Sequence, residues 1–203
     1  MIRWVLISFS YIFHPLFIPA YTTTLFYTIS PKFFPQPEVI TNLVSLILIS
    51  CFLPLIIYTI LFKLDKVSTI HLKNPQERII PLIIQAVIFI IIGSIIFKDF
   101  RHEELKLFFW ASGLSAFIAL IFALNNIKAS LHMIALSAPV VFCVFLSIFY
   151  QINILKGLVI GTILIAFTCI SRLIMKAHNL KEIICGIIIG IVPQMFVFLI
   201  YRI

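Results

Sequence analysis

The segment Ile79–Phe97 reads IIPLIIQAVIFIIIGSIIF and contains no charged side chain. A transmembrane α-helix needs about 20 consecutive, mostly apolar residues, and this segment has that length and character. Further apolar runs lie on both sides of it, at Val5–Tyr27, Val39–Phe62, Leu105–Leu124, Leu131–Tyr150, Ile154–Ile170 and Ile183–Tyr201. The pattern predicts an all-α integral membrane bundle of six or seven transmembrane helices, formed by a single domain over residues 1–203.

The first apolar run differs from the others because His14-Pro15 and Pro19 interrupt it. Proline lacks a backbone N–H and clashes with the preceding helical turn, so it bends or breaks a helix. We therefore expect this run to be kinked or partly re-entrant. Whether it crosses the membrane decides between six and seven crossings.

The composition excludes an ordinary soluble domain. Hydrophobic residues make up 63% of the chain and charged residues 11%, against about 45–50% and 25% in soluble domains. The net charge of +8 comes from Lys and Arg in short breaks between apolar runs, not from a continuous basic stripe, so no nucleic-acid partner is expected. Bilayer lipids are the expected surroundings. The four cysteines lie inside apolar runs without metal-ligand spacing, and neither a metal nor a cofactor is predicted.

Three polar loops fall on one side of the predicted bundle: Lys63–Arg78, Asn125–Ser130 and Ser171–Glu182. Each pair of successive loops in this set is separated by two crossings. Losing the first crossing would move only the N-terminus, so the three loops stay together. Their polar residues can converge at one face, and the candidates are Lys73, Arg78, Lys128, Ser130, His132, Ser171, Arg172, His178 and Glu182.

These side chains fit phosphoryl chemistry. Fixed cations neutralise phosphate oxygens, one imidazole can attack phosphorus, and another can protonate the leaving oxygen. Helices that begin near Ser130 and Glu182 would also direct free N–H groups and positive dipole ends at the same place, which favours an anion.

The run SRLIMKAHNLKE (Ser171–Glu182) resembles the third signature of the type 2 phosphatidic acid phosphatase superfamily. That signature reads Ser-Arg, five residues, His, three residues, Asp. Ser171, Arg172 and His178 match in spacing, and Glu182 stands where the family usually has Asp.

The run KASLHM (Lys128–Met133) resembles the second signature, Pro-Ser-Gly-His, with Ser130 and His132 in place. Ala129 and Leu131 replace the proline and the glycine.

The first signature, Lys, six residues, Arg-Pro, is matched only in part. Arg78 fits it, while a proline follows at Pro81 and His71 takes the place of the lysine, with Lys73 nearby. Two predicted spans separate Arg78 from the second signature, more than the family usually has.

The resemblance implies a membrane phosphohydrolase that works without metal on a lipid phosphate or diphosphate. His178 would attack phosphorus and form a phosphohistidine, Glu182 would orient it, and His132 would protonate the leaving group. The residues implied to hold the phosphoryl oxygens are Arg172, Ser130, Lys128, Arg78 and Lys73.

Each candidate also has a structural explanation. Asn179 and Glu182 have the spacing of a helix cap, Ser130 can be an N-cap, and Lys176 and Lys181 can be membrane-flanking charges. His14 lies inside an apolar run, where ionisable groups tend to be functional. Alternatively, it can bond a carbonyl group freed by the nearby prolines.

Two other functions stay open. The chain can be a non-catalytic accessory or lipid-binding protein with a degenerate phosphatase site. A haem- or quinone-binding subunit is less favoured, because no two histidines obviously face each other at mid-membrane depth. The expected location is the bacterial inner membrane. Counting Lys and Arg gives no clear orientation once the predicted phosphate ligands are set aside, and the family resemblance favours an outward-facing site.

Overall fold

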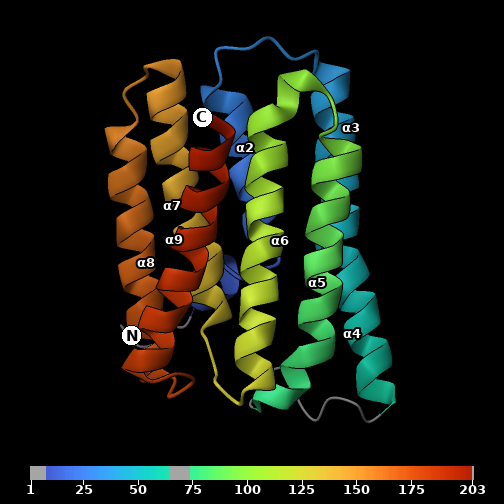
Figure 1. The fold of residues 1–203 in the computed structure, drawn as a ribbon, viewed down its shortest axis with the longest axis vertical. Helices are drawn as coiled ribbons and strands as arrows, with labels where there is room; N and C mark the ends of the chain where they lie inside the picture. Colours follow the sequence, from blue (N-terminus) through green and yellow to red (C-terminus); the bar gives the residue numbers. More distant parts are fainter. Residues whose placement is uncertain (1–7, 65–73, 203) are drawn as a thin grey trace.

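The protein is a bundle of α-helices in the computed structural model, which describes residues 8–64 and 74–202 (Figure 1). These described residues contain no β-strand, so the all-α prediction is confirmed. The helices are α2 (Ile18–Ile29), α3 (Gln36–Ile47), α4 (Leu53–Lys63), α5 (Ile79–Ile91), α6 (Glu103–Leu124), α7 (Leu131–Tyr150), α8 (Leu155–Ile174) and α9 (Leu180–Arg202). A π-helical turn at Leu48–Phe52 joins α3 to α4, and another at Ile92–Ile96 extends α5.

Six stretches of the described residues are long and apolar enough to cross a membrane. They are Gln36–Lys63, Pro75–Ile96, Phe100–Leu124, Leu131–Tyr150, Leu155–Ile174 and Leu180–Tyr201. Each overlaps one of the apolar runs predicted after the first, although most boundaries differ. The chain is therefore an integral membrane protein.

The first apolar run is interrupted, as the sequence predicts. Residues 8–12 are helical, residues 13–17 form turns around His14 and Pro15, and α2 then begins beside Pro19. With 12 residues, α2 is too short to span a bilayer by itself. The whole run nevertheless extends along the bundle: Ser10 Oγ lies 2.8 Å from Ser171 Oγ, and Tyr27 Oη lies 3.0 Å from His102 Nε2. These two contacts lie toward opposite ends of the bundle.

The two ends carry different loops (Figure 1). We call the end that holds residues 74–78, 125–130 and 175–179 the lower end, and the end that holds residues 30–35, 97–102 and 151–154 the upper end. In the structure the described parts of the three predicted polar loops thus share one end.

The third polar loop is shorter than predicted. Helix α8 continues to Ile174, so Ser171 and Arg172 lie in its last turn, and Glu182 lies in the first turn of α9. Asn179 caps α9: its Oδ1 accepts the Glu182 N–H at 2.9 Å, and its Nδ2 donates to Glu182 Oε1 at 3.3 Å. The predicted helix cap is therefore present, and it shortens the loop to residues 175–179.

Helices α7 and α9 pack closely because two glycines of α9 face α7. A Cβ atom on Gly186 would lie 2.6 Å from the Ser130 carbonyl oxygen, and one on Gly190 would lie 2.5 Å from the Ile134 carbonyl oxygen. Only hydrogen fits there, so the two backbones approach as small residues allow in membrane bundles. The Glu182 carbonyl accepts the Ser130 N–H at 3.0 Å across the same contact. We call this contact the glycine seam.

Candidate functional site

A cavity of about 540 Å³ opens inside the bundle toward its lower end. Its walls come from residues 10–19 and from α4, α5, α6 and α7, and most lining side chains are apolar. Its ionisable lining residues belong to the first segment, to the lower-end loops and to neighbouring helices. They are Tyr11, His14, Tyr58, Arg78, His132, Arg172 and His178. An apolar chamber with basic groups near one end fits an amphiphilic anion.

Four predicted site residues from three separate sequence motifs line this cavity: Arg78, His132, Arg172 and His178. The bundle brings them together because each belongs to an element that starts or ends at the lower end. Arg78 precedes α5, His132 lies in the first turn of α7, Arg172 lies in the last turn of α8, and His178 precedes α9.

His178 is held by Glu182. Its Nδ1 lies 2.6 Å from Glu182 Oε2, and a carboxylate can only accept, so Nδ1 donates. In the neutral imidazole this bond leaves Nε2 unprotonated. Nε2 has no hydrogen-bond partner among the described residues, and the side chain is 3% exposed. This arrangement presents a lone pair on an oriented, buried ring.

The surroundings keep His178 neutral. Burial lowers the pKa of its imidazole, and the nearby cations Lys128, Arg78 and Arg172 lower it further, while the hydrogen bond to Glu182 raises it. The net result is a pKa of about 4. At neutral pH the ring is therefore a nucleophile or a hydrogen-bonding group, and not a cation.

Arg172 carries a positive charge at the cavity without a matching carboxylate. Its Nη1 contacts Met175 Sδ at 3.9 Å, and it forms no ion pair with any acidic residue of the described chain. Its Nε is buried and has no hydrogen-bond partner among these residues. Arg172 as a whole is partly buried, and a cation withdrawn from water usually has a partner, so its guanidinium group is suited to bind an anion.

Arg78 is 4% exposed and anchors a neighbouring loop. Its Nη1 donates to the Ala129 carbonyl at 2.7 Å. Arg78 therefore has a structural contact and also lines the cavity. Lys128 acts similarly on the next loop, since its Nζ donates to the Ala177 carbonyl at 2.9 Å.

His132 and His14 form a pair in the cavity wall. Their ring centroids are 5.4 Å apart and the planes are nearly perpendicular. His132 Nε2 lies 3.1 Å from the Ser10 carbonyl oxygen, which can only accept, so Nε2 carries a proton. His14 Nδ1 accepts the Leu16 N–H at 3.4 Å. The sequence left the role of His14 open, and its position inside an apolar run was the signal for a functional group.

Four predicted site residues of the described chain do not line the cavity, and one of them is Ser171, whose Oγ lies 2.8 Å from Ser10 Oγ. Ser130 is fully buried at the glycine seam, and its Oγ has no hydrogen-bond partner among the described residues. Lys128 lies behind the loop that it anchors, and Glu182 reaches the cavity only through His178. Lys73 lies outside the described residues.

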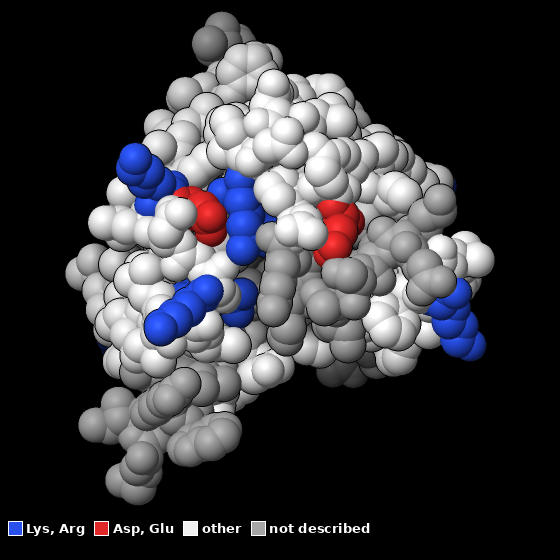
Figure 2. All heavy atoms as spheres, turned by 90° about the horizontal axis from the view of Figure 1, so that it is seen from below, with Lys and Arg blue, Asp and Glu red and all other residues white. Residues whose placement is uncertain are grey.

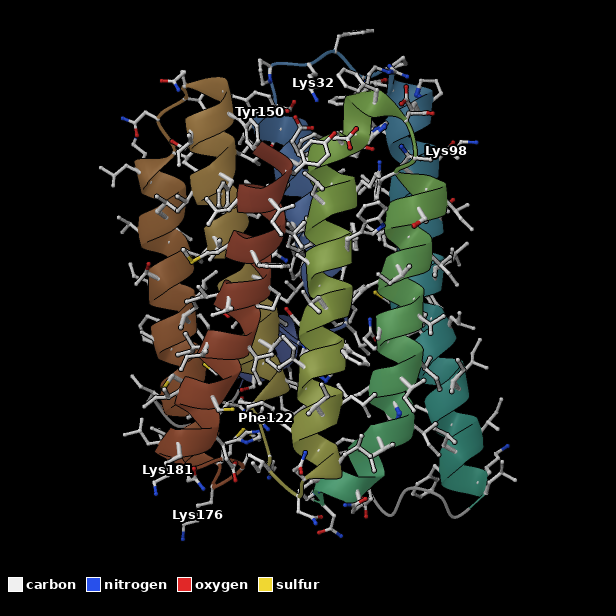
Figure 3. All side chains as sticks on the ribbon, in the orientation of Figure 1. Lys32, Lys98, Phe122, Tyr150, Lys176 and Lys181 are labelled. Atoms are coloured by element: carbon white, nitrogen blue, oxygen red, sulfur yellow. The ribbon has the colours of Figure 1, made fainter. Side chains whose placement is uncertain are left out.

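The lower face is rich in cations. Figure 2 shows several Lys and Arg side chains on one side of this face around an acidic group, a second acidic group apart from them, and a further basic side chain at the opposite edge. Lys176 and Lys181 point away from the bundle (Figure 3), as expected for charges that flank a membrane. The cations that line the cavity are thus a separate set from those on the outer rim.

Part of the cavity wall is exposed on the surface of the bundle. Three of its lining residues, Tyr11, Phe17 and Leu55, are themselves 59%, 42% and 48% exposed. They belong to the first segment and to α4, so these two elements carry exposed residues of the cavity wall. An apolar surface of this kind suits a lipid chain entering from the bilayer.

No protein-family model, no curated protein and no solved structure matches this chain. The function must therefore be inferred from the site, which has an oriented imidazole, two arginines and a second histidine around an apolar cavity.

Proposed function

We propose that this protein is a membrane-embedded lipid phosphate or diphosphate phosphohydrolase that acts through a phosphohistidine intermediate. The observation that carries the proposal is the convergence of Arg78, His132, Arg172 and His178 on one cavity, with His178 held by Glu182. The motif resemblance to the type 2 phosphatidic acid phosphatase superfamily leads to the same chemistry, which needs no metal because arginines supply the positive charge.

The proposed reaction begins at His178. Its Nε2 lone pair attacks phosphorus, the P–O bond to the lipid breaks, and the ring becomes phosphorylated. His132 as an imidazolium gives a proton to the leaving oxygen. Since His132 Nε2 donates to the Ser10 carbonyl, Nδ1 is the ring atom that exchanges this proton. Water then attacks the phosphohistidine, His132 takes the proton from that water, and inorganic phosphate leaves.

The remaining residues hold the substrate and the loops. Arg172 and Arg78 bind phosphoryl oxygens, since both guanidinium groups line the cavity. Lys128 supports the site through the Ala177 carbonyl and through its charge near His178. Ser130 is a phosphate ligand only if its buried hydroxyl turns toward the cavity. The lipid chain would occupy the apolar part of the cavity.

A second candidate is a non-catalytic accessory or lipid-binding protein. It is favoured by the positions of Ser130 and Lys128, two predicted phosphate ligands that do not line the cavity. Ser130 is buried at the glycine seam, and Lys128 Nζ bonds to the Ala177 carbonyl. Such a protein would bind a lipid phosphate in the same chamber without hydrolysing it.

We place the protein in the bacterial inner membrane with the lower end facing outward. This orientation follows the motif resemblance. Cysteine labelling of the exposed residues Lys176 and Lys98, which lie at opposite ends, measures it directly in intact cells.

The function is tested by phosphate release from purified protein in detergent. The panel contains undecaprenyl diphosphate, phosphatidylglycerol phosphate, phosphatidate and a lipid A phosphate, each with EDTA present. We expect release from at least one lipid, loss of release in His178→Ala, and normal release in Lys181→Ala, whose side chain points away from the bundle. Release that does not depend on His178 would contradict the mechanism. Tight binding without release from a folded sample would favour the accessory protein.

A further inference from the structure

One polar side chain of the cavity wall has no role in the proposed reaction. Gln85 lies near the middle of the span Pro75–Ile96, is partly buried, and lines the cavity. Its amide has no hydrogen-bond partner among the described residues, whereas the other deeply placed glutamine, Gln194, donates to the Phe108 carbonyl and to Ser112 Oγ. An amide without a hydrogen-bond partner at membrane depth costs free energy. A polar group of a bound ligand would provide Gln85 with that partner.

Gln85 stands above the phosphate-binding end on the same face of α5. It follows Arg78 by seven residues, which is close to two helical turns and about 10 Å along the axis. Helical side chains lean toward the helix N-terminus, which here means toward Arg78. The amide therefore lies closer to the basic end than its Cα does, at a depth a short way into the apolar part of the cavity.

The hydroxyl groups of two nearby serines show which hydrogen-bond donors remain for a ligand. Ser112 Oγ donates to the Phe108 carbonyl at 2.8 Å, and Ser115 Oγ donates to the Ala111 carbonyl at 3.1 Å. Both serines line the cavity, but their protons are already used within α6. Among the lining residues of α5 and α6, the amide N–H groups of Gln85 are therefore the donors without an acceptor in the described chain, and an acceptor on the ligand would pair with them.

We propose that Gln85 forms a second polar subsite that binds the carbonyl oxygen of an acyl ester or amide close to the phosphate of the lipid. This inference rests on the proposed function. In an acylglycerol phosphate about six covalent bonds separate phosphorus from the nearest carbonyl oxygen, roughly 7 Å when extended. That span falls within the rise of about 10 Å between Arg78 and Gln85 along the helix axis. A polyprenyl phosphate has no oxygen at this position, so the subsite selects acylated lipids.

The test compares two lipids that differ only in the ester carbonyl groups of their two chains. Diacylglycerol phosphate and dialkylglycerol phosphate of equal chain length are hydrolysed by the wild type, by Gln85→Leu and by Gln151→Leu, a control at the exposed upper end. We expect kcat/KM of the wild type and of the control to favour the ester lipid about tenfold, as one hydrogen bond allows. Gln85→Leu should lower this ratio to about one and leave hydrolysis of the ether lipid unchanged.

The outcomes separate this inference from the function on which it rests. Equal hydrolysis of both lipids by the wild type, or an unchanged preference in Gln85→Leu, overturns the subsite and leaves the phosphohydrolase in place. Hydrolysis of a polyprenyl phosphate at a rate equal to that of the ester lipid also overturns it. A folded wild type that releases phosphate from none of these lipids overturns the proposed function, and the subsite with it.

Discussion

The two ends of the bundle hold charged residues in opposite ways. At the upper end charges meet one another: Lys32 Nζ lies 2.7 Å from Glu104 Oε2, and Arg101 Nη2 lies 2.9 Å from Glu38 Oε2. At the lower end Arg172 lines a cavity and has no carboxylate partner in the described chain. Paired charges hold the loops of the upper end in place, whereas the lower end leaves positive charge available for a ligand.

One histidine at each end can also be compared. His102 at the upper end is 1% exposed and its Nε2 lies 3.0 Å from Tyr27 Oη and 3.4 Å from Asn42 Nδ2. His178 at the lower end has one ring nitrogen bound to Glu182 and presents the other toward the cavity. Both rings are therefore held at one nitrogen, and His102 Nδ1 is buried without a hydrogen-bond partner among the described residues. The two histidines differ in their surroundings, because His178 lines the cavity and His102 does not.

The upper end also resembles a metal site in outline. Ligand atoms of Glu38, Asp99 and His102 all lie within 4.8 Å of one another. However, Arg101 Nη2 lies 3.0 and 2.9 Å from the two carboxylate oxygens of Glu38. The carboxylate is thus already neutralised by an arginine, which agrees with a structural role for this end.

The strongest test of the lower end is Glu182→Gln. The amide keeps the size of the side chain, but it can present N–H in place of oxygen to His178 and favour the wrong tautomer. We expect phosphate release to fall by about 10³-fold. The measurement is kcat on the preferred lipid, with the elution profile in detergent as a check on folding. Activity within tenfold of the wild type would show that Glu182 only caps α9.

Arg172→Ala and Arg101→Ala form a matched pair across the two ends. Loss of Arg172 removes an unpaired cation from the site, so we expect kcat/KM to fall about 10²-fold while the unfolding temperature stays the same or rises. Loss of Arg101 breaks an exposed ion pair, which costs about 0.2–1 kcal/mol of stability and leaves kcat/KM unchanged. Equal effects of the two changes on kcat/KM would contradict the view that the lower end binds substrate and the upper end is structural.

The smallest expected effect concerns pH. The low pKa of His178, about 4, results first from burial and then from the cations near it, of which Lys128 is the first. Protonated His178 cannot attack phosphorus, so activity should fall as the pH drops through about 4. Lys128→Gln removes one cation, raises the pKa of His178, and should move this acid limb upward by less than about one pH unit. Lys98→Gln at the upper end should leave the pH profile unchanged.

The transmembrane pattern was predictable because bilayer thickness imposes a minimum length on each apolar run. The break at His14-Pro15 was predictable too, because proline cannot continue a helix. The predicted helix ends were less accurate. For example, α8 was expected to stop at Ile170, and it continues to Ile174. A hydropathy pattern ends at the first polar residues, whereas Ser171 is fully buried against Ser10 and therefore extends the helix inside the protein.

Irregular turns inside the spans carry no pattern in the sequence. The π-helical turn Leu48–Phe52 lies just before Pro54, whose ring would clash with the carbonyl group four residues earlier in a regular helix. The proline is visible in the sequence, yet a kink, a break or a π-turn can each relieve the clash. Packing in the folded protein decides among them.

For the site, the sequence predicted which loops share an end, because that depends only on counting crossings. It did not predict which side chains face the cavity. Ser130 and Lys128 belong to the second sequence motif, yet the motif does not determine where their side chains lie. The close packing at the glycine seam buries Ser130, and the Ala177 carbonyl binds Lys128 Nζ. Gln85 was missed because a single glutamine in an apolar run gives no motif.

The glycine seam also determines which parts of the protein can move. Because Gly186 and Gly190 leave no space between α7 and α9, these two helices behave as one rigid unit, and the Ser130–Glu182 backbone bond joins their lower ends. His132 and His178 are carried by this unit and keep a constant separation. In the proposed reaction, exchange of lipid and product would then fall to the first segment and α4, which carry exposed residues of the cavity wall. Turnover is therefore expected to depend on the thickness and fluidity of the surrounding bilayer, which act on those outer elements and not on the seam.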